Sequence, residues 1–178
     1  MSFFESHWVL TVLLLLPLAG GVACLFAGEK DAKHVALGTS VVAFLVSLPL
    51  FWTFRQDTAA LQNFVSIPWI GQWGIGYTVG IDGISLLMVM LTTFVMPMAI
   101  LGSYSYIKRQ QQSYYSMLLI LMSAMIGVFI ALDMFLFFLF WELMLIPMYF
   151  LIGVWGGERR IYAAIKFFLF TAVGSLLM

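Results

Sequence analysis

The chain has 178 residues, of which 63% are hydrophobic and 9% are charged, and its mean hydropathy is +1.07. Because soluble globular domains carry about 25% charged residues, this composition excludes an ordinary soluble domain and predicts an all-α, polytopic bundle of transmembrane helices. The formal net charge is zero, which argues against a nucleic-acid-binding protein and makes the position of each charge more informative than the total.

Six hydrophobic segments have about the length of a membrane span, because about twenty helical residues at 1.5 Å per residue cross a hydrocarbon core of roughly 30 Å. They are residues 8–27, 35–54, 84–104, 116–132, 134–155 and 161–178. The first segment is longer than the core of a signal peptide, about 7 to 15 residues, and no Lys or Arg precedes it. We interpret it as a retained span in which Cys24, the single cysteine of the sequence, is a small packing residue.

Basic residues are concentrated in every second connection between these segments. Three connections share Lys30, Lys33, Lys108, Arg109, Arg159 and Arg160. The other connections contain only Arg55. By the positive-inside rule, loops 28–34, 105–115 and 156–160 are predicted to be cytoplasmic, with the N-terminus on the outer side of the membrane.

The long connection at residues 55–83 is predicted to be a periplasmic loop within a single membrane domain, residues 1–178. Its second half alternates apolar and small residues among glycines, which favours a short extended ribbon before the third segment. Asp82 stands where the third helix should begin, and we interpret its carboxylate as a helix N-cap rather than an ion ligand. Asp133, at the tight turn between the fourth and fifth segments, is predicted to cap the fifth helix in the same way.

Glu142 has the strongest functional claim, because it stands within an otherwise apolar run, residues 134–153. Insertion scales assign a charge at the centre of a span a cost of about 2.5 to 3.5 kcal/mol, so such acids usually face a partner or water inside a bundle. Burial raises a carboxylate's pKa and a nearby lysine lowers it, so a movable partner can make such an acid take up and release a proton. We favour a proton site over the alternative, an acid held permanently by a neighbouring helix.

Three further residues are candidates for the same site. Pro147 removes the backbone hydrogen bond to the Leu143 carbonyl and can kink the helix, and a packing kink without function is an equal alternative. Tyr149, seven residues after Glu142, lies on about the same helix face and can extend a polar stripe. Lys166 is the only basic residue within a segment. For Lys166 we favour snorkelling to the cytoplasmic surface or a local ion pair over a proton relay.

The sequence shows no pattern of a metal or redox site. The two histidines, His7 and His34, are far apart in the sequence. The methionines cluster in the third and fourth segments without histidine or cysteine nearby, which favours adaptable packing over copper or haem ligation. No phosphate-binding glycine loop and no CxxC pair is present. We therefore expect no metal and no cofactor bound by this chain.

Three stretches carry a resemblance to a known family. They are GIDGISLLMVMLT after the ribbon, FFLFWELMLIPMYFLIGVWGG around Glu142 and RRIYAAIKFFLFTAVGSLLM in the last segment. Together they closely resemble the antiporter-like, proton-pumping chain M family of membrane subunits in bacterial NADH:quinone oxidoreductase, respiratory complex I. The Trp-Glu-Leu-x-x-x-Pro motif, Trp141 to Pro147, is quite specific for this group. The resemblance runs over the whole chain but covers only the first six helices of a longer family chain, so we expect a fragment or the product of a split gene.

The resemblance implies a role for Glu142 in proton translocation. In the family, the matching glutamate of helix five pairs with a lysine on a broken helix seven, which would lie beyond Met178, and Lys166 matches a lysine of helix six. The resemblance also implies that NADH, FMN, iron–sulfur clusters and quinone belong to partner subunits. The expected partners are other membrane subunits of complex I, especially the sister antiporter-like subunits, and membrane lipids.

These observations predict the N-terminal portion of a proton-translocating subunit, part of a translocase that couples quinone reduction to proton pumping and has no redox centre of its own. One alternative is a subunit of a sodium/proton antiporter complex, which is a transporter without redox coupling. A second alternative is an assembly fragment without transport activity.

Overall fold

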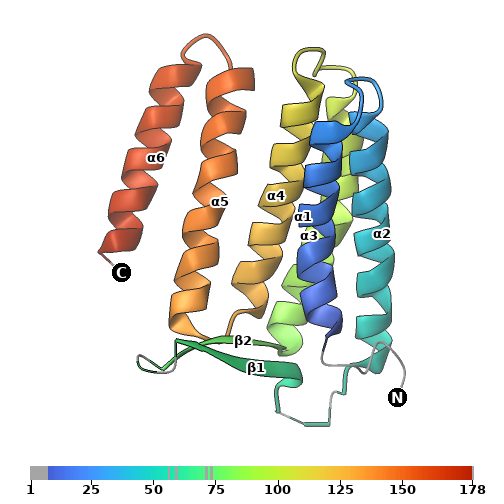
Figure 1. The fold of residues 1–178 in the computed structure, drawn as a ribbon, viewed down its shortest axis with the longest axis vertical. Helices are drawn as coiled ribbons and strands as arrows, with labels where there is room; N and C mark the ends of the chain where they lie inside the picture. Colours follow the sequence, from blue (N-terminus) through green and yellow to red (C-terminus); the bar gives the residue numbers. More distant parts are fainter. Residues whose placement is uncertain (1–7, 56, 59, 71, 73, 178) are drawn as a thin grey trace.

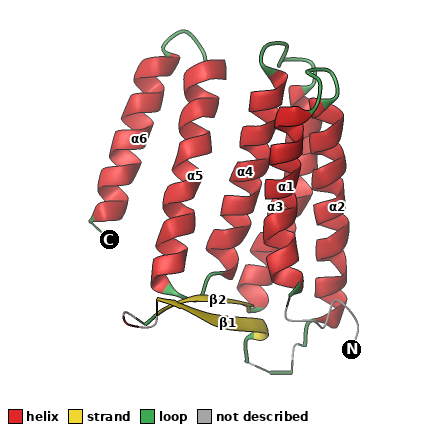
Figure 2. Cartoon of the chain, in the orientation of Figure 1, coloured by secondary structure: helices red, strands yellow, loops and turns green. Residues whose placement is uncertain are grey.

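The computed structural model describes residues 8–55, 57–58, 60–70, 72 and 74–177, so His7 lies outside the described residues. Within this part the chain forms helices and one pair of strands (Figures 1 and 2). In chain order these elements are α1 (Val9–Phe26), α2 (Ala32–Thr53), β1 (Gln62–Ile70), β2 (Ile75–Ile81), α3 (Gly83–Ser103), α4 (Gln111–Ile130), α5 (Met134–Trp155) and α6 (Arg160–Leu176).

The helices run alternately up and down, so that the connections α1–α2, α3–α4 and α5–α6 lie at one end and the strands lie at the other (Figure 1). Five helices, α1 to α5, are long and apolar enough to cross a membrane, and α6 has 17 described residues. This architecture confirms the predicted polytopic helix bundle with a short ribbon. We call the two ends of the bundle the basic end and the ribbon end.

Two helices begin three or more residues earlier than the hydropathy pattern predicted. α4 begins at Gln111 instead of residue 116, and α2 begins at Ala32 instead of residue 35. The first turn of α4 is polar, and Gln112 Nε2 donates a hydrogen bond to the carbonyl of Ala27 in the neighbouring connection. Polar first turns extend beyond the apolar layer, so an apolar window does not detect them. The predicted loops 28–34 and 105–115 are therefore shorter than expected.

The best-packed part of the molecule is the four-helix group α1 to α4. α4 buries eleven residues, whereas α5 buries four and α6 buries two. Hydroxyl groups, and not charged side chains, join these helices in pairs. Ser123 Oγ of α4 donates to the Leu14 carbonyl of α1 at 2.6 Å, and Ser47 Oγ of α2 lies 2.8 Å from Thr93 Oγ1 of α3. In an apolar environment such bonds satisfy groups that water cannot reach. α5 packs against α4 and α6, and α6 packs mainly against α5.

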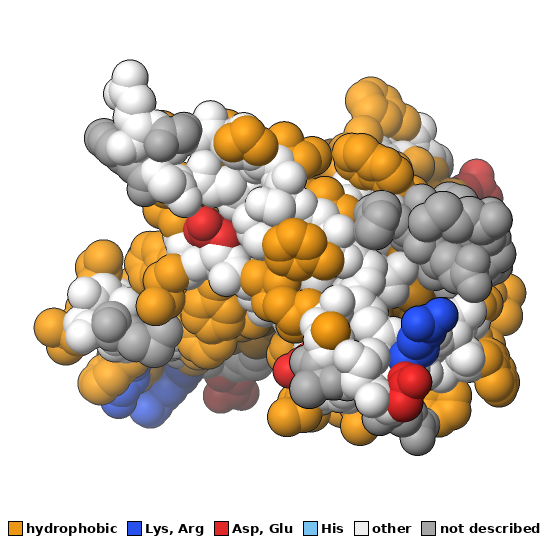
Figure 3. All heavy atoms as spheres, turned by 90° about the horizontal axis from the view of Figure 1, so that it is seen from below, with side chains coloured by type: hydrophobic (Ala, Val, Ile, Leu, Met, Phe, Trp, Pro, Cys, Tyr) orange, Lys and Arg blue, Asp and Glu red, His pale blue; other side chains and the backbone are white. Residues whose placement is uncertain are grey.

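The ribbon is an antiparallel hairpin that is fastened to the turn between α4 and α5. Leu132 N–H donates to the Thr78 carbonyl at 2.9 Å, and Gly76 N–H donates to Asp133 Oδ2 at 3.3 Å. The hairpin is also fastened to α1, because the Tyr77 hydroxyl lies 3.0 Å from Thr11 Oγ1. Seen from this end, hydrophobic side chains occupy much of the visible surface and few charged side chains interrupt them (Figure 3).

The predicted caps at Asp82 and Asp133 are confirmed. Asp133 Oδ1 accepts the backbone N–H groups of Phe135 and Leu136, at 2.9 and 3.1 Å. Asp82 Oδ1 accepts the Ser85 N–H at 2.7 Å, and Ser85 Oγ in return accepts the Asp82 N–H at 2.8 Å, which is a reciprocal capping box. The Ser85 backbone N–H is the main cause that lowers the pKa of Asp82 below its ordinary value of 3.8.

We expect Asp82→Ala to lower the free energy of unfolding by about 1 kcal/mol at neutral pH, the usual cost of losing an N-cap acceptor. A carboxyl whose pKa is lower in the folded state stabilises above its ordinary pKa and loses that contribution as pH falls through the folded value. The difference between wild type and Asp82→Ala should therefore narrow below pH 3.8. Thermal unfolding in detergent at several pH values measures this. Asp57→Ala, an exposed acid outside the helices, is the matched control and should show no such difference.

Candidate functional site

Glu142 lies inside α5, eight residues after its first residue, Met134. At 1.5 Å per residue this places it about 12 Å along the helix from the ribbon end and about 20 Å from the basic end. The side chain is half-buried in the described chain. Glu142 is thus a carboxyl group within the apolar layer, about 4 Å from the middle of its helix on the side of the ribbon end.

One face of α5 packs along one face of α6, and Glu142 lies on it. Ser175 Oγ donates a hydrogen bond to Glu142 Oε1, and the rings of Tyr149 and Phe168 meet edge to face at 5.7 Å. Nearer the basic end, a Cβ placed on Gly153 would lie 3.5 Å from the Cβ of Ala164. Steps of seven and four residues along α5 match steps back of seven and four along α6, as antiparallel helices in constant register require. We call this contact the α5–α6 seam.

Ser175 is the site residue that the sequence reasoning missed. Glu142 lies 13 residues before the last residue of α5, Trp155, and Ser175 lies 15 residues after the first residue of α6, Arg160, so the two are nearly equally far from the turn. In an antiparallel helix pair with a short turn, residues at equal distance from the turn face each other when both lie on the contact face. This symmetry was a signal available in the sequence.

The structure brings Tyr149 into the α5–α6 seam with Glu142 but places Pro147 elsewhere. Tyr149 is nearly two turns after Glu142, on the same face, as predicted. Pro147 is seven residues after Phe140, and the Phe140 ring packs on Gly127 of α4. Pro147 is buried and shares that α4-facing side, and α5 continues through it to Trp155. Pro147 therefore acts on the α4 contact and not directly on the surroundings of Glu142.

Lys166 lies on the other side of α6 from Glu142. It is nine residues before Ser175, which is two and a half turns at 3.6 residues per turn, so the two side chains are on opposite faces. The Lys166 side chain is exposed, and its Nζ lies over the rings of Tyr162 and Phe170 at 5.7 and 5.9 Å. It forms no ion pair with any residue that the structure describes. Lys166 and Glu142 therefore form no direct pair in this arrangement. The alternatives for Lys166, which are snorkelling, a local ion pair or a relay, stay predictions.

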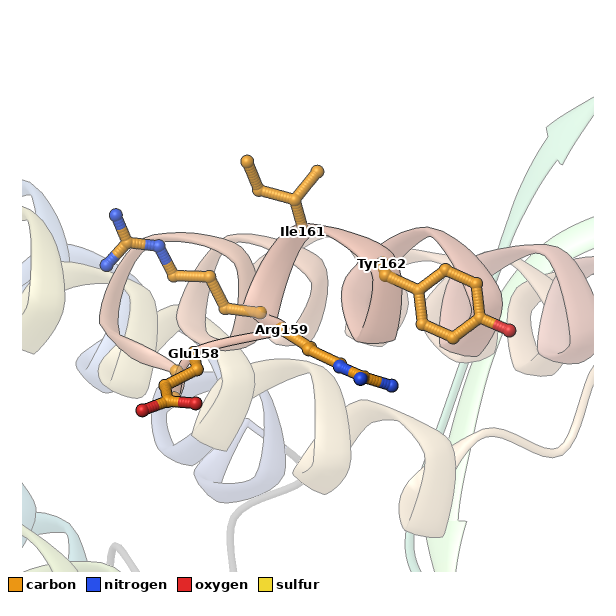
Figure 4. A pocket seen from close by; sticks show the side chains of 7 residues that line it. Glu158, Arg159, Ile161 and Tyr162 are labelled. Atoms are coloured by element: carbon orange, nitrogen blue, oxygen red, sulfur yellow. The ribbon is translucent and has the colours of Figure 1, made fainter.

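Two pockets open along the α5–α6 seam on the basic side of Glu142. One of about 300 Å³ is lined by Tyr149, Phe150, Gly153, Val154, Ile161 and Ala164. The other, of about 210 Å³, is lined by Tyr149, Ile165, Phe168 and Leu169. Tyr149 lines both pockets and is, of their lining residues on α5, the one closest to Glu142 along the helix. A larger hollow of about 620 Å³ lies at the α5–α6 turn, where Glu158 and Arg159 are among its lining residues (Figure 4).

The charges at the two ends of the bundle differ in sign. The three connections at the basic end contain all six basic residues named for them, and Arg109 is tied to α5 because Trp155 Nε1 donates to its carbonyl at 2.9 Å. The ribbon end has the caps Asp82 and Asp133. Backbone N–H groups, chiefly that of Leu136, lower the pKa of Asp133. Among the described residues there is no cluster of three or more His, Cys, Asp or Glu side chains that could hold a metal ion.

Comparison with known proteins gives two family matches that together span most of the chain. Residues 12–130 match the family model described as NADH-ubiquinone oxidoreductase chain 4, amino terminus. Residues 131–178 match the model described as NADH:quinone oxidoreductase/Mrp antiporter, TM. The boundary between the two matches falls at the start of the α4–α5 turn.

Curated relatives include NADH-quinone oxidoreductase subunit M of Rhodobacter capsulatus, which is 45% identical over 96% of this chain and 34% of its own. Another is F(420)H(2) dehydrogenase subunit M of Methanosarcina mazei, 37% identical over 96% of this chain and 34% of its own. The chain thus spans about a third of the length of the curated relatives that it matches.

Solved structures show the same arrangement of helices. A chain of respiratory complex I from Thermus thermophilus matches with a TM-score of 0.80 and 25% identity, over 94% of this chain and 33% of that chain. A chain of the Mrp complex from a Dietzia species matches with a TM-score of 0.79 and 19% identity, over 94% and 18% respectively, which shows likeness of fold.

Proposed function

Because this chain belongs to the NADH-ubiquinone oxidoreductase chain 4 family, we propose that it is the N-terminal portion of a proton-translocating membrane subunit of an NADH:quinone oxidoreductase. It would contribute to a translocase that couples quinone reduction to proton pumping. The observation that carries the proposal is Glu142, a carboxyl group within the apolar layer that has a hydroxyl donor and no cation beside it among the described residues. A carboxyl group at this depth is costly, and such residues usually mark a path for ions or protons.

In the proposed mechanism, Glu142 exchanges a proton with hydrated space in the bundle, and its charge responds to a lysine that the family resemblance places outside residues 1–178. Tyr149, which lines both pockets of the α5–α6 seam, is in a position to extend a hydrogen-bonded path toward the basic end. Lys166 would act on proton entry at that end. Pro147 would support the site by shaping the contact between α5 and α4.

We propose that the basic end faces the cytoplasm and the ribbon end the periplasm, because positively charged connections are retained on the cytoplasmic side. The N-terminus and the loop 55–83 would then be periplasmic in a bacterial inner membrane, and residues 1–178 would be a single membrane domain. NADH, FMN, iron–sulfur clusters and quinone would be bound by partner subunits. The nearest partners would be the sister antiporter-like subunits.

A second candidate function is a subunit of a sodium/proton antiporter complex. It is supported by the family match of residues 131–178, whose description includes the Mrp antiporter, and by the likeness of fold to an Mrp complex. The oxidoreductase subunit is preferred over the antiporter subunit because residues 12–130 match a family model whose description names NADH-ubiquinone oxidoreductase and no antiporter. The third candidate function is that of an assembly fragment without transport activity.

Purification of the tagged chain from its native membrane separates these functions. We expect subunits with flavin and iron–sulfur absorption to co-purify, and the complex in proteoliposomes to take up protons when NADH reduces quinone. Co-purification of membrane proteins without redox groups, with sodium-dependent proton exchange, would contradict the proposal in favour of the antiporter. If the complex fails to assemble without this chain but pumps fully when Glu142 is replaced by Gln, the chain would be an assembly fragment without transport activity.

A further inference from the structure

Ser175 is unusual among the residues of α6 because it is buried. Of the described residues of this helix only Ala164 and Ser175 are buried, and Ser175 is 7% exposed while Leu176 beside it is 76% exposed. The α5–α6 seam is what covers it. At this level of α6 the buried residue is Ser175, and its hydroxyl group faces Glu142, the carboxyl group of α5.

The Ser175 hydroxyl has two acceptors within reach but only one hydrogen. Its Oγ is 3.0 Å from the Ala172 carbonyl and in hydrogen-bond contact with Glu142 Oε1. A serine hydroxyl donates one hydrogen bond and can accept others through its lone pairs. It can therefore donate to the carboxylate or to the carbonyl at a given moment, and it can accept from Glu142 when that side chain carries a proton.

The bond to Ala172 alone would not set Ser175 apart. Other serines of the bundle bond in the same way to a carbonyl three residues earlier, for example Ser40 to Leu37 at 2.9 Å. Such a bond is a common local alternative for serine in a helix. The feature peculiar to Ser175 is its second acceptor, the carboxylate on the neighbouring helix.

The other titratable side chains near α5 make no hydrogen bond to Glu142. They are Tyr149 on α5, Tyr114 and Tyr115 on α4, Arg160, Tyr162 and Lys166 on α6, Tyr77 on β2, Asp133 at the α4–α5 turn, and Glu158 and Arg159 at the α5–α6 turn. Among the described residues, Ser175 is thus the one side chain in hydrogen-bond contact with the Glu142 carboxyl.

We propose that Ser175 is a positioning residue that holds the Glu142 carboxyl in both of its charge states, an inference that rests on the proposed function. When Glu142 is ionised, the Ser175 O–H donates to Oε1. When Glu142 gains a proton from hydrated space, the new carboxyl O–H donates to Ser175 Oγ, and the Ser175 hydrogen turns to the Ala172 carbonyl. One O–H bond forms on Glu142, and the Ser175 O–H bond stays intact. The carboxyl therefore keeps its place in the α5–α6 seam through the proton cycle.

The test compares four variants in the assembled complex: Ser175→Ala, Ser175→Thr, Thr171→Val and Glu142→Gln. Thr171→Val is the matched control, because Thr171 Oγ1 bonds only to the Phe167 carbonyl of its own helix, at 2.8 Å. The measurements are protons taken up per quinone reduced and the infrared C=O band of the protonated Glu142 carboxyl. The band that disappears in Glu142→Gln identifies it.

We expect Ser175→Ala to reduce proton uptake about tenfold, the factor that corresponds to about 1.4 kcal/mol, and to shift the Glu142 band to higher wavenumber because a hydrogen-bond partner is lost. Ser175→Thr should restore both, and Thr171→Val should change neither. An unchanged band in Ser175→Ala, or loss of uptake that Ser175→Thr does not restore, would overturn the inference. Full uptake in Glu142→Gln would instead overturn the proposed function itself, so the two failures are distinguishable.

Discussion

Glu142→Gln should reduce redox-linked proton uptake by the assembled complex about a hundredfold, the lower end of what a positioned proton-transfer group contributes. Glutamine has nearly the same shape and cannot titrate, and its side-chain oxygen can still accept the hydrogen bond from Ser175. Packing of α5 against α6 should therefore persist. The measurement is the initial rate of proton uptake in proteoliposomes, together with the amount of assembled complex.

Glu158→Gln is the matched control for this prediction. It makes the same chemical change at the turn between α5 and α6, where Glu158 is exposed and outside the apolar layer. We expect wild-type proton uptake in Glu158→Gln. Pumping that survives undiminished in Glu142→Gln would refute the role assigned to Glu142, whereas equal losses in both variants would point to a general effect of removing charge.

Gly127→Ala should separate α4 from α5 and lower the free energy of unfolding by about 1 to 3 kcal/mol, the usual cost of overpacking a core. A Cβ at Gly127 would lie only 2.5 Å from two carbon atoms of the Phe140 ring. A ring atom cannot withdraw as the end of a flexible chain can, so the helices must move apart. Thermal unfolding of the purified protein in detergent gives the measurement.

Two other helical glycines serve as controls for Gly127. A Cβ at Gly38 of α2 or at Gly102 of α3 meets nothing within 4 Å among the described atoms. Alanine at these positions should leave stability unchanged or raise it by about 0.5 to 1 kcal/mol, because glycine costs about that much inside a helix. The double variant Gly127→Ala with Phe140→Ala should recover part of the loss if the ring clash is the cause. Destabilisation in Gly38→Ala equal to that in Gly127→Ala would rule out the packing explanation.

Features that depend on local chemistry could be predicted from the sequence. The fifth helix was predicted at the residues where it lies, 134–155, because the capping carboxylate of Asp133 precedes it and glycines follow it. Asp82 was predicted as a cap for the same reason. In both cases a single short stretch of chain contains the donor, the acceptor and the apolar run.

Features that depend on contacts between distant segments could not be read from local patterns. β1 occupies a stretch without alternation, in which Val65 is its buried residue, and it forms because β2 offers a partner. The nine-residue spacing puts Lys166 and Ser175 on opposite faces of α6. It does not say which of these two faces meets α5, and only the packing of the helices shows that it is the face with Ser175.

The fastening of the α4–α5 turn to the hairpin has a mechanical consequence for α5. The ribbon end of this helix is held by Asp133 and Leu132 through β2, and β2 is held by α1 through Tyr77. Among the described residues, one hydrogen bond ties the basic end of α5 to the α3–α4 connection, from Trp155 Nε1 to the Arg109 carbonyl. We therefore consider a tilt of α5 about its ribbon end, in which displacement grows with distance from that end. Gly153 is about 28 Å from this pivot and Glu142 about 12 Å, so any tilt of α5 moves Gly153 more than twice as far as Glu142. Glu142 thus lies closer to the held end of α5 than Gly153 does, so a tilt of the helix displaces Glu142 less than it displaces residues at the basic end.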